Sequence, residues 1–124
     1  MPSTPSEFRR LALALPETEE RKHMNHPDFR VAGKIFATLG YPNKERGMVK
    51  LTPVQQEEYV AAHPGAFQPV TGAWGRKGCT SVLLARAHKS ALKQVIRAAW
   101  RNYAPKDLAI KSLLRKAKPA RTGS

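Results

Sequence analysis

The stretch from Ala87 to Tyr103, AHKSALKQVIRAAWRNY, constrains the fold of this chain more than any other segment. Its apolar residues recur at steps of three and four, so they lie on one stripe of an α-helix: Leu92, Val95, Ile96, Ala99, Trp100 and Tyr103. Basic residues recur at every fourth position: Lys89, Lys93, Arg97 and Arg101. No Asp or Glu occurs in this stretch, so no cation there has an acidic partner one turn away. The pattern predicts a helix with one face for a core and another for water or for anions.

Two Thr-Pro pairs, at residues 4–5 and 52–53, mark the starts of two earlier helices. In each case Glu or Gln follows three residues after the threonine, which is typical of a capping box. The first helix is predicted from Pro5 to about Leu15, where Pro16 stops it. The second is predicted to end near Ala62, before a His-Pro-Gly stop.

Between these helices the apolar period changes to two, which indicates β-structure. The predicted strands form an antiparallel meander: Thr18–Met24 at an edge, Phe29–Val31, Lys34–Leu39 and, after a hairpin loop at residues 41–47, Met48–Leu51. Two further strands are predicted after the second helix, at Phe67–Val70 and Cys79–Arg86, and a glycine-rich connection at residues 72–78 joins them. At 124 residues, the chain is expected to form a single domain.

Charge and cysteine content restrict the class of protein. There are 22 Lys and Arg against 9 Asp and Glu, a net charge of +13 that attracts polyanions. From Arg86 to the end, eleven basic residues face one acid, Asp107, so the charge is polarised along the chain. The single cysteine, Cys79, excludes an internal disulfide and fits a reducing compartment. We find neither a secretory signal nor a run long enough to span a membrane, so a cytoplasmic protein is expected.

Several local sequences resemble the MmcQ/YjbR family. They are Leu15-Pro16-Glu17, Leu51-Thr52-Pro53, His63-Pro64-Gly65-Ala66-Phe67, Gly72-Ala73-Trp74-Gly75, Ala99-Trp100 and Ala104-Pro105-Lys106 with Leu108. The resemblance covers Pro5 to Leu108 and implies an α+β fold of the CyaY-like or YjbR-like type, a two-layer sandwich with an antiparallel sheet covered by helices. It places the domain at residues 1–108 and leaves residues 109–124 as a basic extension, partly helical and then disordered. Such domains are described as DNA-binding with a double-wing arrangement, which is an expectation here.

Three basic segments are candidates for binding phosphates: Lys44 and Arg46 at a hairpin tip, Arg76 and Lys77 in the glycine-rich connection, and Lys93, Arg97 and Arg101 on the predicted helix. Glycines let a backbone approach a phosphate closely, and a hairpin tip can act as a wing that reaches a groove. The alternative for each segment alone is a solvated surface. The connection matches neither a Walker loop nor a dinucleotide fingerprint, so no cofactor is expected.

Other residues give weaker signals for function. Trp100 and Tyr103 fall in the apolar stripe and are expected in the core, and packing is favoured over base stacking for Trp74. His23 and His26 have no further ligands at metal spacing, so no metal site is expected. No catalytic set stands out.

We therefore expect a non-enzymatic protein that binds nucleic acid, DNA in preference to RNA, mainly through phosphates. The alternative is an adaptor that binds an acidic protein partner. An enzyme acting on an anionic small molecule is a third option, which a deep pocket with converging polar groups would favour.

Overall fold

The computed structural model of the chain describes residues 3–40 and 43–110. Within them, six strands form one antiparallel sheet in the order β1-β2-β3-β4-β6-β5. The strands are β1 Thr18–His23, β2 His26–Val31, β3 Lys34–Leu39, β4 Arg46–Lys50, β5 Phe67–Pro69 and β6 Cys79–Leu83. The helices are α1 Pro5–Leu13, α2 Pro53–Ala62, α3 Ala73–Arg76, the 3-10 turn η1 Leu84–Arg86 and α4 Lys89–Tyr103.

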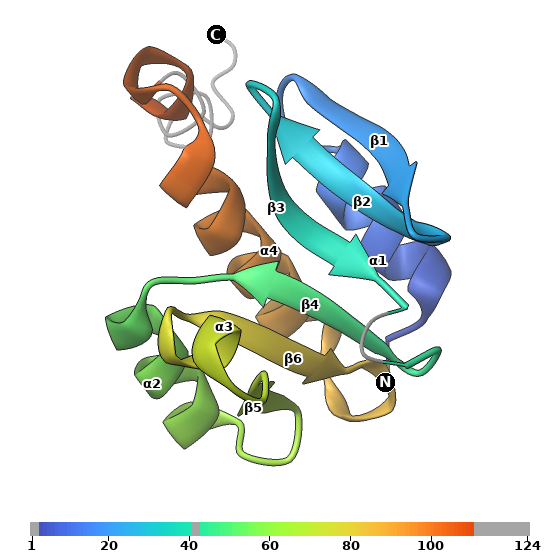
Figure 1. The fold of residues 1–124 in the computed structure, drawn as a ribbon, viewed down its shortest axis with the longest axis vertical. Helices are drawn as coiled ribbons and strands as arrows, with labels where there is room; N and C mark the ends of the chain where they lie inside the picture. The colour runs from blue at the N-terminus through green and yellow to red at the C-terminus, as the bar shows by residue number, and fades with distance from the viewer. Residues whose placement is uncertain (1–2, 41–42, 111–124) are drawn as a thin grey trace, which may run out of the picture.

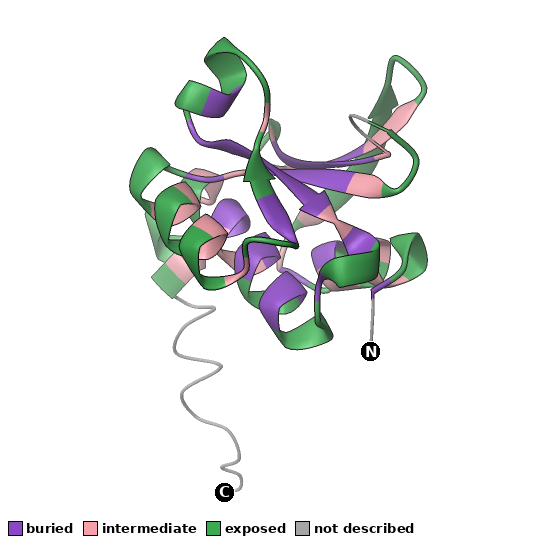
Figure 2. Cartoon of the chain, turned by 90° about the horizontal axis from the view of Figure 1, so that it is seen from below, coloured by how far each residue is buried: buried purple, intermediate pink, exposed green. Residues whose placement is uncertain are grey.

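The helices are distributed unequally over the sheet. Helices α1 and α4 pack on one face, where α4 contacts β3 and β4, and α2 packs beside β5 (Figure 1). The short helix α3 lies on the opposite face, which is otherwise uncovered (Figures 1 and 2). This arrangement confirms the predicted α+β fold with an antiparallel sheet covered by helices. We call the face under α1 and α4 the covered face and the other the open face.

The two Thr-Pro signals begin helices as predicted. The Thr52 hydroxyl accepts the N–H of Gln55, and the Gln55 side chain accepts the N–H of Thr52, which completes a capping box. The Thr4 hydroxyl accepts the N–H of Glu7 in the same way. The Glu7 carboxylate, however, lies 2.8 Å from the Nζ of Lys89, so it ties α1 to the start of α4.

The apolar stripe of α4 forms the centre of the core (Figure 2). Its buried residues are Leu92, Val95, Ile96, Ala99 and Trp100. Trp100 is fully buried, and its Nε1 donates a hydrogen bond of 3.1 Å to the carbonyl oxygen of Pro16. Tyr103 is half-buried against the same core. The prediction that the aromatic residues of this helix serve packing is confirmed.

Several predicted boundaries differ from the structure. Helix α1 ends at Leu13, β6 ends at Leu83 and passes into η1, and β4 already begins at Arg46. Residues 106–110 are helical, so this helical turn includes the first two residues of the extension at residues 109–124. The rest of that extension, for which partial helix and then disorder are predicted, lies outside the described residues.

Candidate nucleic-acid interface and the open sheet face

The sheet separates the predicted phosphate-binding residues into two groups. Lys93, Arg97 and Arg101 lie on α4, over the covered face, whereas Arg76 and Lys77 lie at the end of α3, over the open face (Figures 1 and 2). The sequence identified them as three candidate segments and did not indicate whether they share a face. The fold does not bring them together, because a whole sheet stands between α3 and α4.

Lys93, Arg97 and Arg101, which we call the α4 ridge, are displayed on the solvent side of α4. Lys93 and Arg101 are exposed and Arg97 is half-buried, and none of the three forms an ion pair within the described residues. The Nε of Arg97 is buried and donates to no acceptor in that part of the chain. The exposed cations Lys93 and Arg101 are therefore free to interact with an external anion, and no carboxylate in the described residues neutralises Arg97.

Lys89, at the start of the same helix, differs from the ridge. Its Nζ lies 2.8 Å from the Glu7 carboxylate, and this hydrogen bond lowers the pKa of Glu7 below its usual value. Lys89 is thus partly neutralised by α1, although the sequence places it in the same line of cations.

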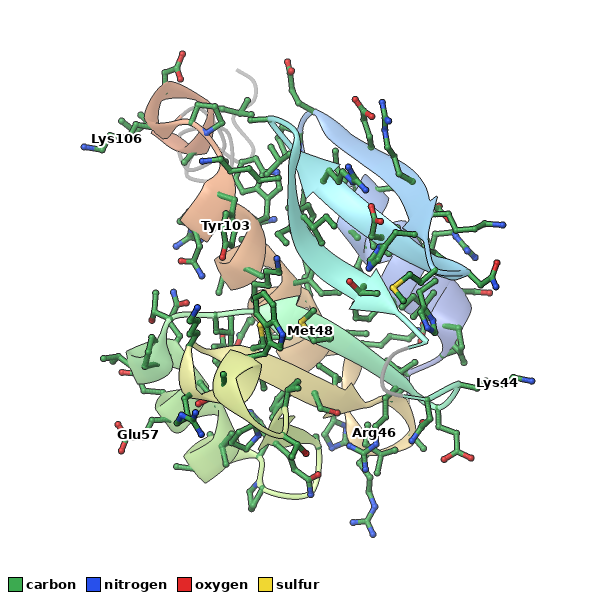
Figure 3. The ribbon with its side chains drawn as sticks, viewed as in Figure 1. Lys44, Arg46, Met48, Glu57, Tyr103 and Lys106 are labelled. Atoms are coloured by element: carbon green, nitrogen blue, oxygen red, sulfur yellow. The ribbon has the colours of Figure 1, made fainter. Side chains whose placement is uncertain are left out.

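The predicted wing at residues 42–47 is only partly free to reach a ligand. Lys44 is exposed at the hairpin end and points away from the body of the protein (Figure 3). Arg46 lies within β4, and its Nη1 donates to the Oγ of Ser81 at 3.0 Å and to the Oε1 of Gln68 at 3.5 Å. Arg46 therefore bridges β4, β6 and β5 instead of extending from a loop.

The glycine-rich connection is a tightly packed helical turn and not the open loop that the sequence suggested. A Cβ on Gly75 would lie 1.6 Å from the carbonyl oxygen of Val70, and one on Gly78 would lie 1.9 Å from that of Leu51. These glycines permit a close approach of two chain segments, not of a phosphate. The amide of Gln56 fixes the turn further by donating to the carbonyl oxygens of Gly75 and Cys79 at 2.9 and 3.0 Å.

Trp74, for which the sequence favoured packing over base stacking, is 61% exposed. It lies on α3, and the Nζ of Lys77 is 5.5 Å from the centre of its ring, a cation–π distance. The indole ring also forms one wall of a pocket of about 330 Å³ on the open face, which we call the sheet pocket.

The floor of the sheet pocket consists of strand residues, and its other wall comes from the β1–β2 turn. Ile35, Thr38, Met48 and Cys79 come from the strands, and His23 and Met24 line the pocket from the end of β1 and the turn after it. Met48 alternates along β4 with Gly47 and Val49, which face the covered side, so the two faces follow from the period of two. The sequence did not indicate this pocket, because its lining residues come from segments that are far apart in the chain.

A buried carboxylate holds one wall of the sheet pocket in place. The Asp28 side chain has no exposed surface, and its oxygens lie 2.7 Å from the Nδ1 of His23 and 2.8 Å from the Nε of Arg30. Burial alone would raise the pKa of Asp28, but the hydrogen bonds from Arg30 and His23 outweigh it, and the pKa is held below its usual value. Asp28 is therefore an anion at neutral pH, which fixes the imidazole with Nδ1–H as donor.

Asp28 was missed by sequence analysis, although a weak signal existed. Asp28 and Arg30 are two residues apart on β2, and His23 on β1 pairs with His26, which is two residues before Asp28. Within the described residues, no group of three His, Cys, Asp or Glu side chains is placed to hold a metal ion. In the same part of the chain, no helix is long and apolar enough to cross a membrane.

Comparison with known proteins agrees with this architecture. The protein is an α+β domain of the kind found in YjbR proteins: the YjbR family model matches residues 13–102, and the chain belongs to that family. The crystal structure of protein DR2400 from Deinococcus radiodurans, which contains a DUF419 domain, is similar to it with a TM-score of 0.68. The sequences are 20% identical, and the match covers 81% of this chain and 78% of that one, a likeness that concerns the fold. No curated protein matches the sequence.

Proposed function

We propose that this protein is a non-enzymatic DNA-binding protein that contacts duplex phosphates through the α4 ridge. The observation that carries the proposal is that one helix carries the exposed Lys93 and Arg101 and the half-buried Arg97, and that none of the three has an acidic partner in the described residues. A helix rises about 1.5 Å per residue, so the ridge spans about 12 Å. One DNA strand presents a phosphate about every 3.4 Å along the axis, so three or four phosphates pass along that length.

The surrounding charge supports the same surface. The segment that follows α4 carries Lys106 among the described residues, and residues 111–124 contain five Lys and Arg and no acid. Side chains of residues on the open face are less available, because Arg46 and Arg30 donate to groups of the protein itself. The proposal therefore places fewer phosphates on the folded domain than the seven predicted residues would have contacted together.

The salt dependence of DNA binding tests the proposal. Each neutralised phosphate contributes about 0.9 to the slope of log affinity against log salt concentration. We expect the triple variant Lys93→Gln, Arg97→Gln, Arg101→Gln to make the slope shallower by about 2.7, measured by fluorescence anisotropy with a labelled duplex. The matched control is Lys44→Gln, Arg76→Gln, Lys77→Gln, which removes the same charge from elsewhere on the domain.

We expect the control variant to change the slope by less than about 1. An equal loss in both triple variants would show that only net charge matters, and the ridge would not be the site. If the wild-type protein does not bind the duplex at low salt, the proposal is wrong. Retention of an acidic protein after nuclease treatment of a lysate would then support the adaptor alternative.

A further inference from the structure

The sheet pocket has the dimensions of a small-molecule site. Its volume of about 330 Å³ is at the lower end of the range of about 300–1,000 Å³ that is usual for ligand pockets. Met24, Ile35, Met48 and Val70 give it a largely apolar lining, to which His23, Thr38 and Lys50 add polar groups. A pocket of this kind on the face opposite the α4 ridge is not explained by DNA binding.

The charged group that lines the pocket is a lysine. Lys50 ends β4 beside Cys79 of β6 and forms no ion pair within the described part of the chain. No Asp or Glu is among the lining residues. Burial raises the pKa of the Cys79 thiol, so this neighbour stays neutral and does not offset the ammonium. The pocket is thus complementary to an anion.

The shape of the pocket wall favours a flat ligand. Trp74 leaves 61% of its surface exposed, and it lines the pocket together with His23. Aromatic rings stack well on such a face, and an exposed tryptophan gains apolar contact when a ring covers it. Because Asp28 binds the Nδ1 of His23, the imidazole orientation is fixed and its Nε2 is left for a ligand.

We propose that the sheet pocket binds a small planar aromatic anion, with its ring against Trp74 and its carboxylate or phosphate against the ammonium of Lys50. The site is independent of the α4 ridge and lies on the other face of the sheet. The shared chemistry is a ring system with one acidic group, which a free aromatic acid and a nucleotide both possess.

NMR of the two indole N–H groups tests this proposal directly. Trp74 lines the pocket, whereas the buried Trp100 donates to Pro16 and acts as an internal reference. Titration with naphthalene-2-carboxylate is expected to shift the Trp74 signal, assigned with Trp74→Phe, in a saturable manner and to leave the Trp100 signal in place. The neutral analogue naphthalene-2-methanol is expected to bind about tenfold or more weakly, the scale of one charge-assisted hydrogen bond.

Two matched variants distinguish the contribution of Lys50 from the effect of removing one positive charge anywhere on the protein. Lys50→Met is expected to remove the preference for the acid over the alcohol, whereas Lys34→Met, an exposed lysine at the start of β3 outside the pocket, is expected to preserve it. A second pair of probes, AMP and adenosine, distinguishes phosphate from carboxylate as the preferred anion. Tighter binding of either anion than of its neutral partner supports the proposal.

Three results would overturn it: no saturable shift of Trp74 with either anion, equal affinity for the anionic and neutral partners, or equal losses in Lys50→Met and Lys34→Met. The triple variant of the α4 ridge is expected to bind naphthalene-2-carboxylate as the wild-type protein does. A failure of the pocket proposal can therefore be told apart from a failure of DNA binding.

Discussion

The two faces of the sheet use charged residues in different ways. On the covered side, the interior is apolar and the cations stand on the outer surface of α4, where Lys93, Arg97 and Arg101 have no acidic partner in the described residues. On the open side, polar groups are bonded to one another within the sheet surface, as in Arg46 with Ser81 and in Asp28 with Arg30. Lys50 differs from these bonded groups, because it lines the pocket without an ion pair in that part of the chain.

This difference follows from what covers each face. A helix that packs on a sheet presents its far side to water, where long cations keep their hydration at little cost. An uncovered sheet face exposes every second side chain, so polar groups there find partners across neighbouring strands. Composition alone therefore does not indicate which cations of a basic protein are available to a ligand.

The two tryptophans give the largest expected contrast between the faces. Trp100→Phe should lower the free energy of unfolding by about 2–3 kcal/mol, because it removes a buried hydrogen bond to Pro16 and leaves unfilled volume. Trp74→Phe should change it by less than about 0.5 kcal/mol, as expected for an exposed side chain. Urea unfolding monitored by circular dichroism measures both. Similar losses in the two variants would show that α3 and its tryptophan are part of the core.

Asp28 is expected to have a smaller effect on the free energy of unfolding, and this effect depends on pH. Its pKa is held below its usual value by Arg30 and His23, so the unfolded chain binds more protons in that range and stability rises with pH there. The contribution is complete above the unfolded pKa, near pH 4, and is lost as pH falls through the lower folded value. Asp28→Asn should cost about 1–2 kcal/mol at pH 7.

The difference between wild type and Asp28→Asn should shrink as the pH falls from 5 toward 2, in urea unfolding at each pH. The matched control is Glu57→Gln, which changes an exposed carboxylate on α2. The expectation would be contradicted if the difference in the free energy of unfolding stayed constant across this range, or if Glu57→Gln showed the same pH dependence. Asp28 would then not be an anion stabilised by Arg30 and His23.

Much of the fold could be predicted from the sequence, because periodicity and caps are local signals. The apolar stripe of α4, the Thr52 cap and the alternating strands needed only neighbouring residues. The four-residue helix α3 could not be predicted. Gly75 and Gly78 are needed because their backbones approach those of Val70 and Leu51, and these close contacts form only once the sheet has formed. The candidate phosphate-binding residues lie on both faces of the sheet for a similar reason. The topology of the sheet decides which face a loop covers, and local sequence does not indicate it.

The smallest expected effect comes from a comparison of two arginines, Arg97 on α4 and Arg46 on the open face. Arg97→Met should leave the free energy of unfolding within about 1 kcal/mol, because it replaces a buried Nε that lacks an acceptor in the described residues with an apolar group of similar length. It should also make the salt slope of DNA binding shallower by about 0.9. Arg46→Met should lower the free energy of unfolding by about 1 kcal/mol, because its hydrogen bond to Ser81 is lost, and should leave the salt slope of DNA binding unchanged. Unfolding and anisotropy on the same two proteins check both halves. If Arg46→Met weakened DNA binding as much as Arg97→Met, the open face would contribute to the interface and the distinction between the faces would fail.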